Sequence, residues 1–356
     1  MKTLITLIVT LLALSQGLIP ALAQSFEDCG AHVSFVTLFY PSPDGSKGNW
    51  KFMKVDDTLN SPAQPVHLPG EAQDVSSDGS EVVVQTPVDE IVIMNTNGEN
   101  QRMLDGGWFP RMSASGRYIS YNSSGYNLKI YDRVAKESWL VVQEDGSPIV
   151  DLQLLAWNPG ADTVMIPVFK AEGQDQLREY DPAQRRFVRT WVTAEPGTGL
   201  ATPVWGKEWL AWLVWQDMST NIAVMNIASG EVQTMDMEGY QRNLDFGPDD
   251  TLAFVDETVD WTRPADHPYS IAQSLWVVHP SDLNNPRSLV NIPGNDLSNP
   301  EWICQDNLVV ESGYGVGGKS LMTVTPSTGA MLPFSTPLSE QLPEGVGLLS
   351  FITSGQ

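Results

Sequence analysis

The chain has 356 residues, of which 43 are acidic and 20 are basic, and its formal net charge at pH 7 is -23. Phosphate binding needs a basic surface, so this balance excludes nucleic acid as the expected partner. An acidic surface suits a cationic ligand or Ca²⁺, but a well-solvated surface is the simpler interpretation, and we expect a soluble monomer.

Residues 1–23 have the pattern of an export signal. Lys2 is the only charged residue among them, residues 4–14 form an apolar run too short to span a bilayer, and Ala21, Leu22 and Ala23 form the small-x-small pattern read by signal peptidase. We predict that the mature protein begins at Gln24, is periplasmic or extracellular, and has no membrane span after cleavage. An uncleaved N-terminal anchor is the alternative.

Residues 24–336 alternate short β-branched and aromatic runs with turns rich in Gly, Pro, Asn and Asp, which predicts an all-β fold. One unit recurs: an apolar or aromatic residue, a polar turn of about four residues, and a β-rich run. The mean spacing of about 46 residues is typical of a four-stranded propeller blade. The first residues of the seven units are Phe26, Val75, Met112, Trp157, Trp205, Phe246 and Trp302.

Each unit continues with a third run that ends at a tight polar turn, such as Asn97–Gly98, Ser229–Gly230 or Thr328–Gly329, and such turns predict a hairpin into a fourth strand. Four antiparallel strands repeated about seven times predict a closed β-propeller, with six or eight blades as alternatives. Within a C-terminal tail of residues 337–356, residues 346–353 could add a ring-closing strand to the first unit or lie across an outer edge. We expect the closely spaced Trp205, Trp209, Trp212 and Trp215 to pack between strands, with one exposed.

Two of the turns resemble those of a known family. The segments Val75–Ser76–Ser77–Asp78–Gly79 and Trp157–Asn158–Pro159–Gly160 are similar to the Trp-Ser-Pro-Asp-Gly-like turn of TolB-type propellers with WD40-like repeats. The resemblance covers nearly the whole mature chain as a degenerate pattern. It implies the fold and says little about function. The family's periplasmic member in the Tol-Pal system carries an additional α/β domain, which we do not expect here.

The two cysteines, Cys29 and Cys304, fall in the turns of the first and last units, which a closed ring makes neighbours. An exported protein folds in an oxidising compartment, so we predict a disulfide that clasps the ring. A metal-binding or catalytic thiol is the weaker alternative, because neither cysteine has a histidine nearby in sequence.

The longest interruption of the repeat lies between residues 255 and 275, and it combines aromatic, cationic, acidic and imidazole side chains. Aromatic rings could stack on a sugar, a guanidinium could pair with a carboxylate, and an Asp–His pair could orient a proton. The alternative is a loop held to its own blade by packing and local salt bridges. With three residues from neighbouring inter-blade loops, the candidate ligand-binding residues are Trp261, Arg263, Asp266, His267, Tyr269, Tyr240, Arg242 and Trp108.

Catalytic and cofactor motifs are scarce. The four histidines show no metal-ligand pairing, and we predict no metal site and no cofactor, with calcium at Asp249 and Asp250 or at Asp56 and Asp57 as the alternative. No nucleophile elbow or phosphate-binding loop occurs. The sequence therefore favours an exported, non-enzymatic scaffold that recognises a protein or glycan partner. The alternatives are an exported hydrolase or lyase acting on a carbohydrate or small substrate at the channel mouth, and an accessory component of an envelope complex.

Overall fold

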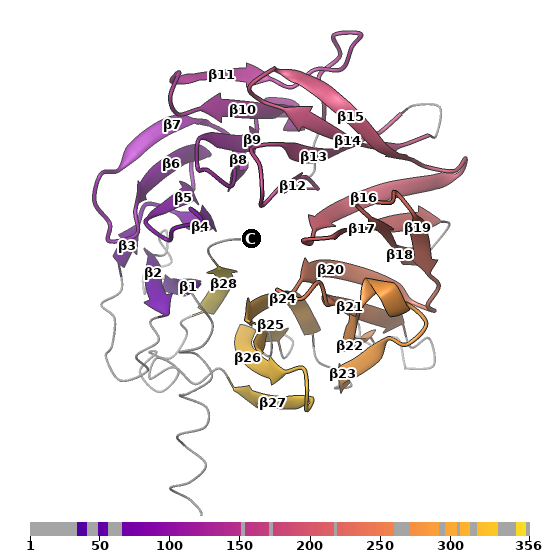
Figure 1. The fold of residues 1–356 in the computed structure, drawn as a ribbon. Coiled ribbons are helices and arrows are strands. Elements are labelled where there is room, and N and C mark those ends of the chain that lie inside the picture. Colours follow the sequence, from indigo (N-terminus) through magenta and orange to yellow (C-terminus); the bar gives the residue numbers. More distant parts are fainter. Residues whose placement is uncertain are drawn as a thin grey trace, which may run out of the picture.

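The computed structural model describes residues 34–40, 49–55, 66–150, 154–170, 174–216, 219–259, 271–291, 296–304, 307–313, 319–333 and 347–353. Within these ranges, 28 strands form seven four-stranded antiparallel blades arranged in a ring (Figure 1). A single parallel bridge between Thr220 and Tyr240 joins the fifth and sixth blades into one longer sheet. The all-β propeller predicted from the repeat is confirmed.

The strands of each blade are named here from the ring axis outward, in the order of blades 1 to 7. The inner strands are β28 (Gly347–Thr353), β4 (Glu71–Val75), β8 (Trp108–Met112), β12 (Ala156–Trp157), β16 (Thr198–Trp205), β20 (Tyr240–Phe246) and β24 (Asp296–Cys304). The second strands are β1 (Ser34–Tyr40), β5 (Glu81–Gln85), β9 (Tyr118–Asn122), β13 (Val164–Val168), β17 (Trp209–Gln216), β21 (Leu252–Val259) and β25 (Asn307–Gly313). The third strands are β2 (Asn49–Val55), β6 (Glu90–Asn95), β10 (Leu128–Asp132), β14 (Gln176–Asp181), β18 (Ser219–Asn226), β22 (Ile271–Val278) and β26 (Lys319–Thr325). The outer strands are β3 (Val66–Leu68), β7 (Arg102–Gly106), β11 (Glu137–Leu140), β15 (Arg186–Thr193), β19 (Val232–Met235), β23 (Arg287–Asn291) and β27 (Ala330–Pro333).

Blade 1 is assembled from both ends of the chain. Its inner strand β28 pairs antiparallel with β1, with Ser34 opposite Thr353 and Val36 opposite Phe351. β28 also contacts β4 of blade 2 and β24 of blade 7 (Figure 1). The C-terminal strand therefore fills the gap that an open ring would leave between the first and last blades, and it covers the inner edge of β1.

The core lies between the faces of neighbouring blades. One cluster joins Val255 and Leu275 of blade 6 to Trp302 and Leu308 of blade 7. Because a central strand is covered on both faces, its apolar residues need not alternate with polar ones, and four consecutive residues of β17 are buried. In this strand Trp212 is 1% exposed, whereas Trp215 at the end is 48% exposed, as the sequence predicted for one member of the tryptophan group.

The polar turn after the inner strand of blade 2 is held by its own side chains. In blade 2, Asp78 accepts hydrogen bonds from Ser76 Oγ at 2.6 Å and from the backbone N–H of Ser80 at 3.0 Å, and these bonds lower the pKa of Asp78 to about 2. Gly79 follows at φ 68°, a left-handed conformation that favours glycine. The repeated turn in the sequence therefore marks the junction between inner and second strands.

The inner strands carry β-bulges that the sequence did not predict. Pairing between the inner and second strands slips by one residue in blades 1, 2, 3, 5, 6 and 7. In four of these blades a residue at the bulge has a left-handed backbone, with φ between 47° and 55°, namely Phe109, Thr202, Asn243 and Asn299. A bulge bends a strand and redirects a side chain. The bulges therefore set which side chains of the inner strands face neighbouring blades and which face the axis.

Helical structure among the described residues is limited to the 3-10 turns η1 (Ser124–Tyr126) and η2 (Pro280–Asp282). In this part of the chain no helix is long and apolar enough to cross a membrane.

Candidate functional site

The inner strands all start at one face of the ring, which is called the upper face here, and all end at the opposite, lower face. Trp108 and Tyr240 are the first residues of β8 and β20, and Arg242 follows two residues later, so all three lie near the upper face. The other five predicted ligand-binding residues, Trp261, Arg263, Asp266, His267 and Tyr269, lie outside the described residues. They belong to the segment between β21 and β22, whose flanking residues Val259 and Ile271 are paired at the same face.

Arg242 joins blades 6 and 7 at this face. Its Nη2 lies 3.2 Å from Glu257 Oε2, and Nη2 also donates to the carbonyl of Leu297 in blade 7 at 3.4 Å. Glu257 accepts a second hydrogen bond, at 3.3 Å, from Gln273 Nε2, and Gln273 Oε1 accepts from the backbone N–H of Leu297. A guanidinium, a carboxylate and an amide therefore link three strands of blade 6 to β24 of blade 7.

Tyr240 lies where blades 5 and 6 meet. It forms the parallel bridge with Thr220, and the hydroxyl of Thr220 donates to the carbonyl of Gln241 at 2.7 Å. The Gln241 side chain is 1% exposed and donates through Nε2 to Asp256 Oδ1 at 2.9 Å, while its Oε1 is buried with no hydrogen-bond partner among the described residues. Asp256 is also buried.

The neighbouring strands of blade 7 contain a further buried carboxylate. Glu311 on β25 is 2% exposed and accepts a hydrogen bond from Ser298 Oγ at 3.2 Å. Gln241, Asp256, Gln273 and Glu311 are all buried near the upper ends of blades 6 and 7. They are called the rim cluster here, although Gln241 bonds to Asp256 whereas Gln273 and Glu311 bond to other residues. Buried polar groups are costly unless paired, so this concentration in strand ends that could be apolar is unusual.

Trp108 is separated from the rim cluster, because it belongs to blade 3. Its ring stacks on Tyr126 with centroids 6.0 Å apart and an interplanar angle of 29°, and Tyr126 is 51% exposed. Tyr126 and Phe109, next to Trp108, both have left-handed backbones, which is uncommon for bulky residues and is found where the surroundings enforce it. The structure therefore brings Tyr240 and Arg242 together but places Trp108 elsewhere on the upper face.

Charged side chains also lie on the inner strands around the axis. Asp74 accepts from the backbone N–H of Met112 in the next blade at 2.7 Å, and Asp245 accepts from that of Trp302 at 2.9 Å. Burial raises the pKa of Asp74, although Arg111 and backbone N–H groups oppose this. The same contact in two blade pairs indicates that these aspartates fasten neighbouring blades.

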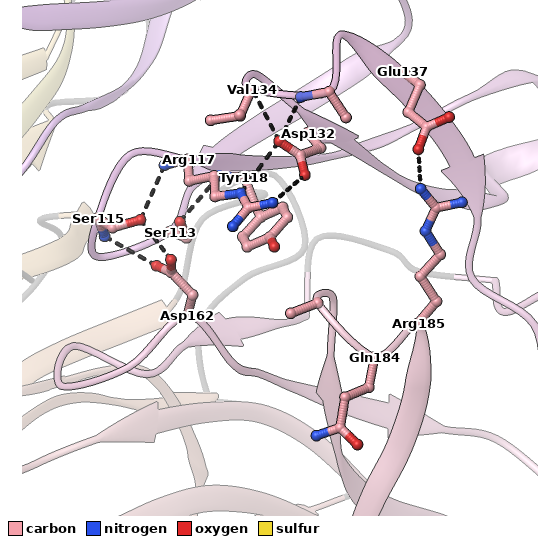
Figure 2. Close-up of polar contacts among 12 residues, drawn as sticks. Ser113, Ser115, Arg117, Tyr118, Asp132, Val134, Glu137, Asp162, Gln184 and Arg185 are labelled. Carbon is pink, nitrogen blue, oxygen red and sulfur yellow. Dashed lines mark hydrogen bonds and ion pairs between the residues drawn. The ribbon is translucent and has the colours of Figure 1, made fainter.

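Polar contacts on the lower face fasten blades 3 and 4 in a similar way (Figure 2). Asp162 of blade 4 accepts from Ser115 N at 3.0 Å and from Ser115 Oγ at 2.5 Å. Within blade 3, Arg117 Nη2 lies 2.8 Å from Asp132, which lowers the pKa of that carboxyl group. Because each of these carboxylates already has a protein donor, this lower-face network is structural.

The acidic residues considered for calcium serve a similar purpose where they are described. Asp250 accepts from the backbone N–H groups of Lys207 and Glu208 at 2.6 and 3.0 Å, and Asp249 accepts from that of Thr251 at 3.1 Å. Asp56 and Asp57 lie outside the described residues. Among the residues that the structure describes, no group of three or more His, Cys, Asp and Glu side chains could hold a metal ion.

Sequence reasoning found Tyr240, Arg242 and the acidic end of β21 but missed Gln273, Ser298 and Glu311. A signal was present, because Gln273 and Glu311 interrupt the apolar runs of β22 and β25. Their partners come from other strands, and for Gln273 from a neighbouring blade. The periodicity of one strand therefore cannot reveal the cluster.

No family model matches the chain, and no curated protein matches it in sequence. Solved structures match its fold. The β-propeller domain of the Trilobed protease from Pyrococcus furiosus is 13% identical with a TM-score of 0.52, covering 75% of this chain and 86% of that chain. An oligogalacturonate lyase in complex with manganese is 14% identical with a TM-score of 0.52, covering 85% of each chain. TolB from Acinetobacter baumannii is 13% identical with a TM-score of 0.48, covering 93% of this chain and 85% of that chain. At these identities the first two comparisons identify the fold alone, a β-propeller.

Proposed function

We propose that the protein is an exported, non-enzymatic binding scaffold that recognises a protein or glycan partner through the upper face at blades 6 and 7. The rim cluster is the observation that carries this proposal. It places buried amide and carboxylate groups beneath a face where Tyr240 and Arg242 are partly exposed. Polar groups held in fixed positions at a surface are the usual source of specificity in a binding site.

The buried oxygen of Gln241 supports the same proposal. A buried acceptor without a donor costs about 1 to 3 kcal/mol, and a ligand hydroxyl or amide could supply the missing hydrogen bond if the strand ends above Gln241 move apart to admit it. The Arg242 guanidinium could in addition exchange its contact with Glu257 for a carboxylate or hydroxyl of the partner, since the arginine side chain is 37% exposed. These groups suit a polar ligand such as a glycan or a protein loop.

Capture of a partner tests the proposal. The purified mature protein should retain a specific partner from envelope extract or on a glycan array. Tyr240→Ala/Arg242→Ala should lose that partner while still unfolding in one cooperative transition, at a melting temperature lowered by loss of the Arg242 contacts to Glu257 and Leu297. Arg287→Ala, on the exposed outer strand β23, is the matched control and should bind normally. Failure of the wild type to bind anything in both assays, or equal binding by the double variant, would contradict the proposal.

An exported hydrolase or lyase is the competing proposal, and it depends on Asp266 and His267. A substrate screen separates the two functions. If turnover is found, and Asp266→Ala and His267→Ala abolish it without changing the melting temperature, the protein is an enzyme. N-terminal sequencing of the exported protein, which should begin at Gln24, tests localisation independently.

A further inference from the structure

Basic residues are concentrated in one part of the ring. Residues 102–189, which form most of blades 3 and 4, hold 11 of the 20 basic residues and 11 of the 43 acidic residues, so this part is neutral and the rest of the chain carries the whole net charge of -23. Within it, Arg185, Arg186 and Arg189 lie at the start of β15 with no acidic residue between them. These three residues are called the arginine edge.

Each guanidinium of the arginine edge is held in place by a neighbour. Arg185 forms an ion pair with Glu137 (Figure 2) and lies 4.3 Å from the centre of the Trp139 ring. Arg186 donates through Nε and Nη2 to Gln184 Oε1, at 3.0 and 2.7 Å. Arg189 lies 3.4 Å from the centre of the Trp191 ring. Fixing these long side chains beforehand reduces the entropy that a ligand contact would cost.

Two of the three arginines form no ion pair with a carboxylate in the described part of the chain. Six basic residues, Arg185 among them, form ion pairs in the described part of the chain. Arg186 and Arg189 form none there. Glu179 lies opposite Arg189 in the strand register, yet its carboxylate accepts from Trp191 Nε1 at 2.9 Å. In so acidic a protein, two fixed and unneutralised guanidiniums are available for an anion.

The strand that carries them is the most extended outer strand of the propeller. β15 has eight residues, whereas the other described outer strands have three to five. Val188, between the two arginines, is 42% exposed. Two irregularities interrupt the pairing of β15 with β14, and bulges of this kind disfavour addition of another strand at an edge. Recognition here would therefore use side chains.

We propose that the arginine edge binds an acidic segment of a partner protein, with carboxylates on either side of an apolar residue. Arg186 and Arg189 lie opposite Asp181 and Glu179, which are two residues apart in β14, so the two arginines are about 7 Å apart along the strand, with the bulged Val188 between them. A sugar ring is a poorer ligand, because Arg185 and Arg189 already occupy ring faces of Trp139 and Trp191. The surface is on the outer edge of blade 4 and does not depend on the proposed upper-face site.

A direct binding measurement tests this inference. The probe is a synthetic twelve-residue peptide of alternating Glu and Val, with a Gln–Val peptide and a polygalacturonate oligomer as comparisons. The wild-type protein should bind the Glu–Val peptide, more weakly as salt increases, and Arg186→Gln/Arg189→Gln should weaken binding by about tenfold or more. Arg102→Gln/Arg287→Gln changes the net charge equally on outer strands β7 and β23 and should leave binding unchanged.

Arg189→Lys adds a test of position, because lysine keeps the charge but loses the planar contact with Trp191. We expect intermediate affinity for this variant. Equal binding of the Gln–Val peptide, equal loss in the Arg102/Arg287 variant, or binding of polygalacturonate alone would overturn the inference. None of these results would change the expected behaviour of the Tyr240/Arg242 variant at the upper face.

Discussion

Two carboxyl groups show how local donors decide the behaviour of an acid in this ring. Burial raises the pKa of Asp105, but donors from Tyr121, the backbone of the following residue, Lys129 and Ser138 outweigh it and lower the pKa to about 2. Lys129 Nζ and Ser138 Oγ lie 3.1 and 3.0 Å from Asp105 Oδ2. Asp105 is therefore ionised at neutral pH and ties blade 2 to blade 3.

Glu301 on the inner strand of blade 7 shows the opposite behaviour. Burial raises its pKa well above the ordinary value, Asp245, Glu311 and Asp74 raise it further, and Arg111 opposes them. Its Oε2 is buried and has no hydrogen-bond partner among the described residues. The protonated form is therefore favoured in the folded protein.

Replacing this carboxyl group should change how stability depends on pH. A carboxyl group whose pKa is higher in the folded state contributes stability that is fully present below its ordinary pKa of 4.5 and is lost as pH rises through the folded-state pKa. Glu301→Gln resembles the protonated side chain at every pH. We expect it to match the wild type near pH 4 and to be more stable than the wild type at pH 7.

Melting temperatures between pH 4 and 8 check this expectation, with exposed Glu208→Gln as the control. A Glu301→Gln curve parallel to the wild-type curve over the whole range would show that Glu301 is not protonated preferentially in the fold.

At the scale of strands and turns, the sequence predicted those features that the residues of a single blade determine. The turn at Val75–Gly79 and the hairpin turns at Gly98, Gly230 and Gly329 are present, and all four glycines, Gly79 included, have left-handed backbones. The bulges of the inner strands were not predictable. Asn243 and Asn299 suit a left-handed backbone, but Thr202 and Phe109 do not, so pairing with the second strand and packing against other blades must impose it.

Contacts between turns of neighbouring blades also could not be predicted from the sequence. Asp250 in the turn of blade 6 accepts two backbone N–H groups of the blade 5 turn, from residues 43 and 42 positions earlier. A Cβ on Gly206 would lie 2.3 Å from Asp250 Oδ1, so glycine is needed for this close approach. The contact between the two turns therefore depends on both the carboxylate of Asp250 and the glycine at position 206.

Asp250→Asn should weaken this contact. Asparagine has one oxygen, so one of the two N–H groups would face the amide N–H instead of an acceptor. We expect a loss of about 1 to 2 kcal/mol in unfolding free energy, measured by chemical denaturation. Asn tolerates the left-handed backbone of Asp250, at φ 63°, so the substitution adds no backbone strain to the measured change in unfolding free energy.

Asp249→Asn is the matched control, because Asp249 is exposed and accepts only from Thr251 within its own turn. Equal destabilisation by the two variants would mean that the inter-blade contact adds nothing to the stability of the local turn.

At the scale of the whole molecule, the sequence predicted the ring because the repeat is periodic, and the ring fixed where the site residues lie. Tyr240 and Arg242 were predicted in an inter-blade loop, and the structure places them on β20, near the upper face where every inner strand starts. Which upper-face residues meet depends on contacts between blades: Arg242 reaches Leu297, 55 residues away, whereas Trp108 lies three blades from Tyr240. Closure of the ring determines which of these residues meet, and no local sequence pattern indicates it.

Closure of the ring also brings together the blades that carry the predicted disulfide between Cys29 and Cys304. Cys304 ends β24 at the lower face of blade 7, and β1 of the adjacent blade 1 begins at Ser34, while Cys29 itself lies outside the described residues. We expect peptide mapping without reductant to recover a linked pair. Because the bond would enclose most of the chain, reduction should cost roughly 5 kcal/mol in the chain-entropy model and lower the melting temperature.

Three variants distinguish the effect of the disulfide from the effect of removing a cysteine side chain. If the bond exists, Cys29→Ser, Cys304→Ser and the double variant should all show the same reduced melting temperature, and reductant should not lower it further. Two free thiols in the exported wild-type protein would contradict the pairing. In that case the pairing of β28 with β1 would hold the first and last blades together without a covalent bond, and deleting residues 347–356 should then produce aggregation through the exposed inner edge of β1.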